Sequence, residues 1–305
     1  MDPDLLHLRL AYFAQRRLRP AFPDAPEDRD DPQLRSAEAA FVEEERANVG
    51  EQAARAPSEP RAFVEWFASL REHGPGQGDP LFPWLESRAS LEEMRWFLTQ
   101  EVAGEAGFDD LVALTQVRMP VRAKLEFARN YWDEMGRGRE PAMHGPLLAQ
   151  LARSLDVDAE PKGIVWEALA LGNLLVALAL DRRYAYHSAG ALGAIELTAP
   201  TRVAYVDRGL QRLGIPKSLR RYFTLHATLD VKHSQAWNQE VLFTLVAEEP
   251  RAARAIAEGA LMRLNAGARC FERYRRELWR LQPTEASQDG AFGLHEPRAN
   301  VVAVS

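Results

Sequence analysis

The stretch RRYFTLHATLDVKHSQAWNQEVLFTLV, residues 220–246, contains neither glycine nor proline and predicts one long helix. Within it, the segment HATLDVKH places His226, Asp230 and His233 at positions i, i+4 and i+7. A helix with about 3.6 residues per turn brings these three side chains to one face. Two imidazoles and a carboxylate on one face of a largely apolar helix indicate a metal site. A single histidine on a helix is more often structural, so the hypothesis requires partner ligands on other helices.

The composition is that of an ordinary globular protein. The chain has 305 residues, of which 46% are hydrophobic and 27% charged, and its formal net charge is −6. This length allows one large domain or two small ones. Arginines are numerous, but they alternate with Glu and Asp, and no basic tract indicates nucleic-acid binding. We therefore expect a charged, ion-paired surface and small-molecule chemistry.

Three further features of the sequence bear on its compartment. The single cysteine, Cys270, excludes an intramolecular disulfide and a cysteine-based zinc or iron–sulfur site. The first residues lack the apolar core of a secretory signal. The longest apolar run, IVWEALALGNLLVALAL at 164–180, contains Glu167 and Asn173 and predicts a buried core helix rather than a membrane span. We expect a cytoplasmic protein that does not insert into a membrane.

Turn and cap residues divide most of the chain into helices. Ser90 followed by Glu93 is a capping box, and no alternating strand of five or more residues is evident. The sequence predicts an all-α bundle. We expect an N-terminal arm and surface helix at 1–57, the main domain at 58–283 and a tail at 284–305. The charged helix at 34–55 could form a homodimer contact.

Candidate partner ligands occur on the other predicted helices. Glu101 follows the apolar segment at 96–98, Glu134 lies close to a helix end, and His144 opens the next helix. Glu196 lies among small and apolar residues, where a lone carboxylate is costly unless a cation compensates it. The complete candidate set is Glu101, Glu134, His144, Glu196, His226, Asp230 and His233. Four carboxylates and three imidazoles suit two divalent iron ions.

These residues resemble the ligand pattern of the heme-oxygenase-like diiron oxidases and oxygenases. That pattern has a Glu on one core helix, Glu-x9-His around a turn, a later Glu, and then His-x3-Asp-x2-His. The resemblance covers roughly residues 60–280, and the spacing from Glu134 to His144 is similar to that of the members that oxygenate amines. Members that cleave C–C bonds resemble one another in a shorter Glu-x2-His.

The resemblance implies an all-α, heme-oxygenase-like bundle and a specific chemistry. It implies a protein that holds two iron ions, uses dioxygen as co-substrate and converts the amine of a small metabolite to a hydroxylamine or nitro group. Electrons would come from an external donor such as a ferredoxin or reductase. It also implies that Glu101, His144 and His233 hold one iron, that Glu134, His226 and Asp230 hold the other, and that Glu196 ligates or bridges them.

Several other residues have both a chemical and a structural interpretation. His187 could hydrogen-bond Glu196 or line a pocket, Glu105 could support the ligands, and Tyr186 could form a pocket wall. For each of them a structural role is the more common one. Asp133 is expected to face solvent. An arginine could bind a substrate carboxylate, with Arg202 and Arg220 as candidates.

Three alternatives stay open at this point. A diiron oxidase could carry out a different reaction, such as C–C cleavage, desaturation or decarboxylation. Cys270 could act as a nucleophile, as in the thiaminases of the broader helical superfamily. A metal-binding protein without catalysis could use the same ligands. The small residues at 189–194 favour an enzyme, because they could leave space beside the metals.

Overall fold

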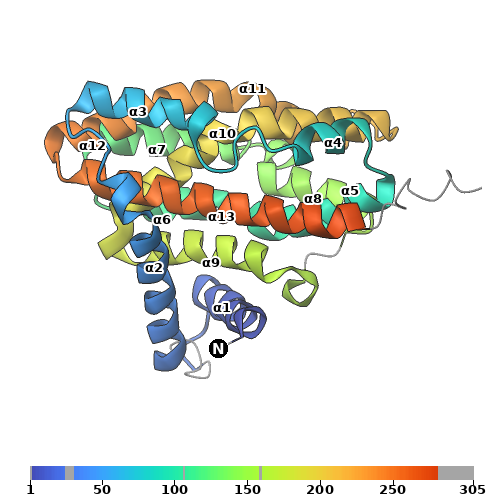
Figure 1. Ribbon diagram of the computed structural model, residues 1–305, viewed down its shortest axis with the longest axis horizontal. Coiled ribbons are helices and arrows are strands. Elements are labelled where there is room, and N and C mark those ends of the chain that lie inside the picture. Colours follow the sequence, from blue (N-terminus) through green and yellow to red (C-terminus); the bar gives the residue numbers. More distant parts are fainter. Residues whose placement is uncertain (1, 25–30, 106, 158–159, 281–305) are drawn as a thin grey trace, which may run out of the picture.

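The computed structural model of the chain describes residues 2–24, 31–105, 107–157 and 160–280, and these residues form a helical bundle without strands (Figure 1). The α-helices are α1 (Pro3–Leu18), α2 (Pro32–Ala53), α3 (Pro60–His73), α4 (Leu81–Ser87), α5 (Leu91–Glu105), α6 (Phe108–Thr115), α7 (Val121–Glu134), α8 (His144–Ser154), α9 (Trp166–Leu180), α10 (Ala185–Arg212), α11 (Arg221–Ala236), α12 (Phe243–Glu248) and α13 (Ala252–Arg280). The prediction of an all-α, heme-oxygenase-like bundle is confirmed.

The centre of the bundle is the close crossing of α10 and α13. A Cβ atom on Gly190 would overlap the backbone carbonyl of Ile256, and one on Gly259 would overlap the carbonyl of His187. Glycine is the residue that permits this approach of two backbones. The interpretation that the small residues at 189–194 leave space beside metals was therefore wrong for Gly190, which serves the packing of two helices.

The long helix expected at 220–246 is present from residue 221 to residue 248, and it contains a π-helical segment. Between α11 and α12, residues Trp237–Leu242 form a π-helical segment, η5. Trp237 is fully buried, its Nε1 donates to the carbonyl of Ala189 at 3.1 Å, and its ring meets that of Phe127 edge-on at 4.7 Å. A Cβ on Gly193 would lie 2.6 Å from that Nε1. The extra residue of a π turn thus places the indole between α7 and α10.

The two N-terminal helices pack on the bundle rather than extending from it. Leu10 and Phe13 of α1 and Phe41 and Val42 of α2 belong to the same hydrophobic core as α9, α10 and α13. Figure 1 shows α2 standing crosswise to α13, with α1 beside it under α9. The core is therefore continuous across the predicted boundary at residue 57. The predicted tail at 284–305 lies outside the described residues.

No helix in the described part of the chain has both the length and the hydropathy needed to cross a bilayer. The apolar run at 164–180 forms α9, whose Asn173 side chain is buried and donates to the carbonyl of His7 at 2.9 Å. This confirms the prediction of a buried core helix there.

Candidate metal centre

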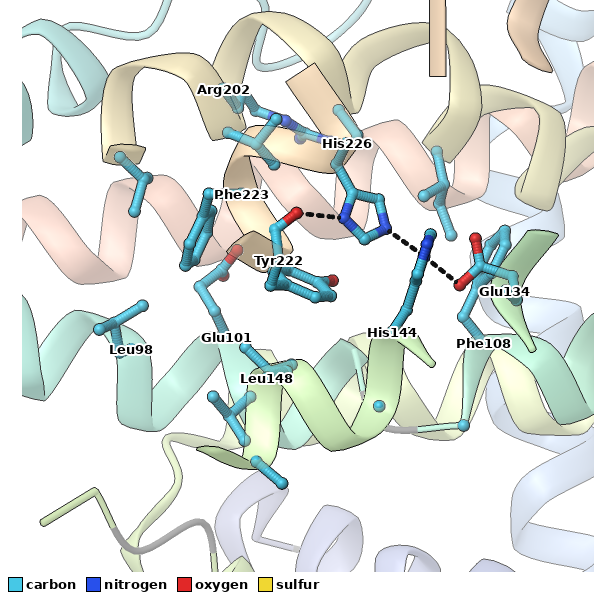
Figure 2. A pocket seen from close by; sticks show the side chains of 18 of the residues that line it. Leu98, Glu101, Phe108, Glu134, His144, Leu148, Arg202, Tyr222, Phe223 and His226 are labelled. Carbon is cyan, nitrogen blue, oxygen red and sulfur yellow. Dashed lines mark hydrogen bonds and ion pairs between the residues drawn. The ribbon is translucent and has the colours of Figure 1, made fainter. Parts of the chain in front are cut away.

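Three of the predicted ligands converge at one point in the bundle. His144 Nδ1 lies 2.7 Å from Glu134 Oε2 and 3.1 Å from His226 Nε2, and the candidate ligand atoms of all three residues lie within 4.8 Å of one another (Figure 2). The three side chains come from the end of α7, the start of α8 and the middle of α11. Glu134 and His144 are buried, and His226 is half-buried.

The hydrogen bonding of His226 fits a metal ligand. Its Nδ1 lies 2.8 Å from the carbonyl oxygen of Tyr222, which can only accept, so Nδ1 carries a proton and donates it. In the neutral ring this leaves the lone pair on Nε2, which faces His144 and Glu134 (Figure 2). Metal-binding histidines in proteins are usually fixed in this way. Metal–ligand bonds of about 2.1 Å place ligand atoms about 3 to 4 Å apart, so these three residues need little movement to hold one ion.

The loop between Glu134 and His144 sets their relative position. Gly136 has a φ of +61°, and a Cβ there would lie 2.5 Å from the carbonyl carbon of Ala142 and 2.6 Å from the nitrogen of Met143. The chain can therefore fold back on itself tightly only at a glycine. The nine residues between the two ligands form this reversal, which brings the first residue of α8 beside the last residue of α7.

A second cluster of polar side chains comes from α7, α10 and α11. Glu196 Oε1 accepts from Asn130 Nδ2 at 2.5 Å, and Glu196 Oε2 lies 3.6 Å from His233 Nδ1. His233 Nε2 lies 3.0 Å from Asp133 Oδ2. Burial alone would lower the pKa of His233, but Glu196 and Asp133 together raise it to about 9. His233 therefore lies between two carboxylates, and this group is separate from the three residues that converge at one point.

A cavity of about 220 Å³ connects the first group with Glu196 and Glu101. Glu101 and Glu134 lie on opposite sides of the His144–His226 pair in Figure 2. Most of the cavity wall is apolar, with Phe97, Leu98, Phe108, Leu148, Ile195, Val203 and Phe223 among its residues. A space of this size, with convergent polar groups at one side, has the character of a small-molecule site.

One arginine lies in the wall of this cavity. Arg202 Nη2 donates to Thr198 Oγ1 at 3.0 Å, and its guanidinium lies 5.4 Å from the centre of the Phe271 ring. These contacts hold the guanidinium in position. The other candidate, Arg220, is buried in an ion pair with Asp207 at 2.5 Å and donates to the carbonyl of Ile215 at 3.0 Å, so it fixes the turn before α11.

Of the remaining candidates, His187 and Tyr186 have other contacts, and the side chains of two more are not described. His187 Nε2 lies 3.0 Å from Glu258 Oε2, so His187 joins α10 to α13 instead of supporting Glu196. Tyr186 is half-buried and packs against the main hydrophobic core. The side chains of Glu105 and Asp230 lie outside the described residues. Their proposed roles stay predictions.

Cys270 lacks the environment of a nucleophile. The thiol is fully buried, and burial followed by the nearby charge of Glu101 raises its pKa to about 12. Only the thiolate is a good nucleophile, and a cysteine in such surroundings is a structural residue. The geometry therefore speaks against the hypothesis of cysteine-based catalysis.

Sequence reasoning missed three polar residues at the site. Asn130 contacts Glu196, Asp133 contacts His233 instead of facing only solvent, and Asp109 lines the cavity. The spacing of Glu126, Asn130 and Glu134 at i, i+4 and i+8 on α7 was a usable signal, because all three are buried on one face. Asp109 gave no comparable signal, because acidic residues are common in the first turn of a helix.

Comparisons with known proteins agree with this fold and identify a family. Residues 95–268 match the family described as iron-containing redox enzymes, and this match spans more than half of the chain. The chain belongs to that family. A search of curated proteins finds no match.

The solved structures that share the fold include the following two. Both are crystal structures of a CADD-like protein of unknown function from Nostoc punctiforme PCC 73102. One is 19% identical with a TM-score of 0.55 and covers 73% of this chain and 97% of its own. The other is 17% identical with a TM-score of 0.51 and covers 80% and 99%. At this identity the similarity shows the fold alone.

Proposed function

We propose that this protein is a diiron, dioxygen-dependent oxygenase that oxidises the amine of a small metabolite. The observation that carries the proposal is the convergence of Glu134, His144 and His226 at one side of a largely apolar cavity. One ion would be held by these three residues, so His144 is grouped with Glu134 and His226 rather than with Glu101 and His233 as the resemblance implied. The second would be held by Glu196 and His233, with Glu101 and Asp230 as further ligands on the basis of the resemblance.

The wall of the cavity supports a particular kind of substrate. Its apolar residues suit a hydrocarbon or aromatic body, and Arg202 suits a carboxylate at the end of that body. The spacing of Glu134 and His144 is similar to that of amine-oxygenating members of the family. Together these features favour an apolar amine that also carries a carboxylate.

One oxygenation would consume one molecule of dioxygen, two electrons and two protons. One oxygen atom of dioxygen enters the N–H bond to give a hydroxylamine, and the other leaves as water with two electrons and two protons from an external donor. Bound iron would supply the activation of dioxygen. The chain holds its ligands in place through the Tyr222 carbonyl on His226 and the Asn130 amide on Glu196. The apolar wall limits the access of water to the reacting amine.

Product analysis with labelled oxygen tests the proposal. The Fe(II)-loaded protein is mixed with a set of aromatic and aliphatic amino acids and then exposed to ¹⁸O₂ and a chemical reductant. The proposal predicts a product with one or two ¹⁸O atoms on nitrogen, which is absent with His144→Ala. A product shortened by C–C cleavage, with no label on nitrogen, would instead identify an oxidase of another reaction type.

A further inference from the structure

Arg263 of α13 is a charged side chain buried inside the bundle. It is only 4% exposed, and its Nε and Nη1 have no hydrogen-bond partner among the residues that the structure describes. A buried guanidinium is costly unless acceptors and opposite charge compensate it. The chain makes room for it, because a Cβ on Gly267 would lie 2.6 Å from Nη1. Its position therefore requires an acceptor.

Gln100 of α5 contributes a second unmatched donor to the same place. Its Oε1 accepts from the backbone N–H of Val165 at 2.9 Å, and this contact fixes the orientation of the amide, since a backbone nitrogen can only donate. The Nε2 group is left without a hydrogen-bond partner among the described residues, although Gln100 is only 1% exposed. Two independent side chains thus present N–H groups that lack an acceptor.

Both side chains line one small cavity between α5, α6, α9, α10 and α13. Its volume is about 20 Å³, which is close to the space that one water molecule occupies. Glu101, Phe108 and Ile195 form walls of both this cavity and the larger one. The small cavity cannot hold a metabolite, but it can hold a single atom that accepts hydrogen bonds.

We propose that this cavity is a binding site for one small monovalent anion, such as a halide ion, between Arg263 and Gln100. An anion supplies both the acceptor and the opposite charge that a buried guanidinium requires, whereas water supplies only the acceptor. Glu101, which accepts a hydrogen bond from Tyr274, is the acidic residue in this lining. This step rests on the proposed function, in which Glu101 ligates iron: a carboxylate whose charge is shared with a metal ion leaves the charge of Arg263 largely uncompensated. The anion would leave Glu101 available to the larger cavity.

Bromide is a suitable probe, because it can be located directly. Crystals of the unaltered protein are soaked in sodium bromide, and anomalous diffraction is measured above the bromine absorption edge. The proposal predicts a peak within hydrogen-bond distance of Arg263 Nη1 and Gln100 Nε2. A cavity that holds only water under these conditions overturns it. Neither outcome depends on iron or on turnover, so the result is separate from that of the proposed oxygenase activity.

Thermal unfolding gives an independent test in solution. At constant ionic strength, replacement of gluconate by bromide should raise the unfolding temperature of the wild type in proportion to occupancy. This rise should be lost in Arg263→Met and reduced in Gln100→Leu, but kept in Arg276→Met, which removes an exposed arginine from the same helix. An equal rise in all four proteins contradicts the proposal. If Arg263→Met does not fold, the comparison of Gln100→Leu with Arg276→Met still decides the outcome.

Discussion

The proton on Nδ1 of His226 determines which of its ring nitrogens can bind a metal. The Tyr222 carbonyl holds that proton, and the lone pair on Nε2 therefore faces Glu134 and His144. The helix spaces residues 222 and 226 about one turn apart, which places this carbonyl within reach of the imidazole. The sequence alone predicted the ligand types and their order, but the tautomer follows only from the backbone contact.

Gly136 tests the geometry between two ligands. We expect Gly136→Ala to lower the free energy of unfolding by about 2 kcal/mol, because the positive φ and the contact with Ala142 both oppose a Cβ. It should also lower the affinity for Fe(II), since His144 would move away from Glu134. Denaturant unfolding and iron titration measure the two effects.

Gly214→Ala is the matched control for this change. Gly214 has a φ of +80°, but a Cβ there meets nothing within 4 Å. The control should therefore lose some stability through backbone strain and bind iron as the wild type does. Equal iron affinity in both variants would contradict the role assigned to the loop.

Individual helices were largely predictable from local signals, and the exceptions have a common cause. His144 opens α8 and Ser90 precedes α5 in the predicted capping box, where Ser90 N donates to Glu93 Oε2 at 2.7 Å. The π-helical segment that begins at Trp237 was not predictable, because it follows from the packing of that indole against α7 and α10. Close helix crossings such as that at Gly190 are likewise non-local, and small residues alone do not distinguish them from an open pocket.

The crossing of α10 and α13 gives a prediction at the scale of two elements. Gly190→Ala should destabilise the protein by about 2 to 3 kcal/mol, because the methyl group would overlap the Ile256 carbonyl and force the helices apart. Gly172→Ala in α9 is the control, because a Cβ there meets nothing within 4 Å. That change should be neutral or stabilising by about 0.5 to 1 kcal/mol. A Gly190 variant as stable as the wild type would disprove the close crossing.

The docking of α1 on α9 should depend on pH through His7. Burial, and then the charge of Arg269, lower the pKa of His7 from 6.5 to about 4. Between these values the unfolded chain binds more protons than the folded one, so stability should fall as the pH falls from about 6.5 to 4. Other groups also titrate there, and the contribution of His7 is isolated by substitution.

The comparison uses two histidine variants. In His7→Leu, the loss of unfolding free energy between pH 6.5 and pH 4 should be smaller than in the wild type, because no buried imidazole has to stay neutral. In His73→Leu, which alters an exposed histidine at the end of α3, the loss should equal that of the wild type. The same pH dependence in all three proteins would exclude His7 as the cause.

The whole molecule is a single helical framework that brings residues far apart in sequence to one cavity. Glu101, Glu134, His144, Glu196 and His226 all line it, although they come from α5, α7, α8, α10 and α11. The order of ligands along the chain was sufficient to predict that these helices face one another. It was not sufficient to predict the Asn130 and Asp133 contacts, because these depend on how α7 is rotated against α10 and α11.

The iron content after anaerobic loading with Fe(II) tests the central claim most directly. Our account predicts about two iron ions per chain in the wild type, as in other helical carboxylate sites, and the loss of at least one ion in His144→Ala. The His73→Ala control should bind as much iron as the wild type. An iron content of one or none in the wild type, or unchanged binding in His144→Ala, would contradict the assignment of this cavity as a diiron centre.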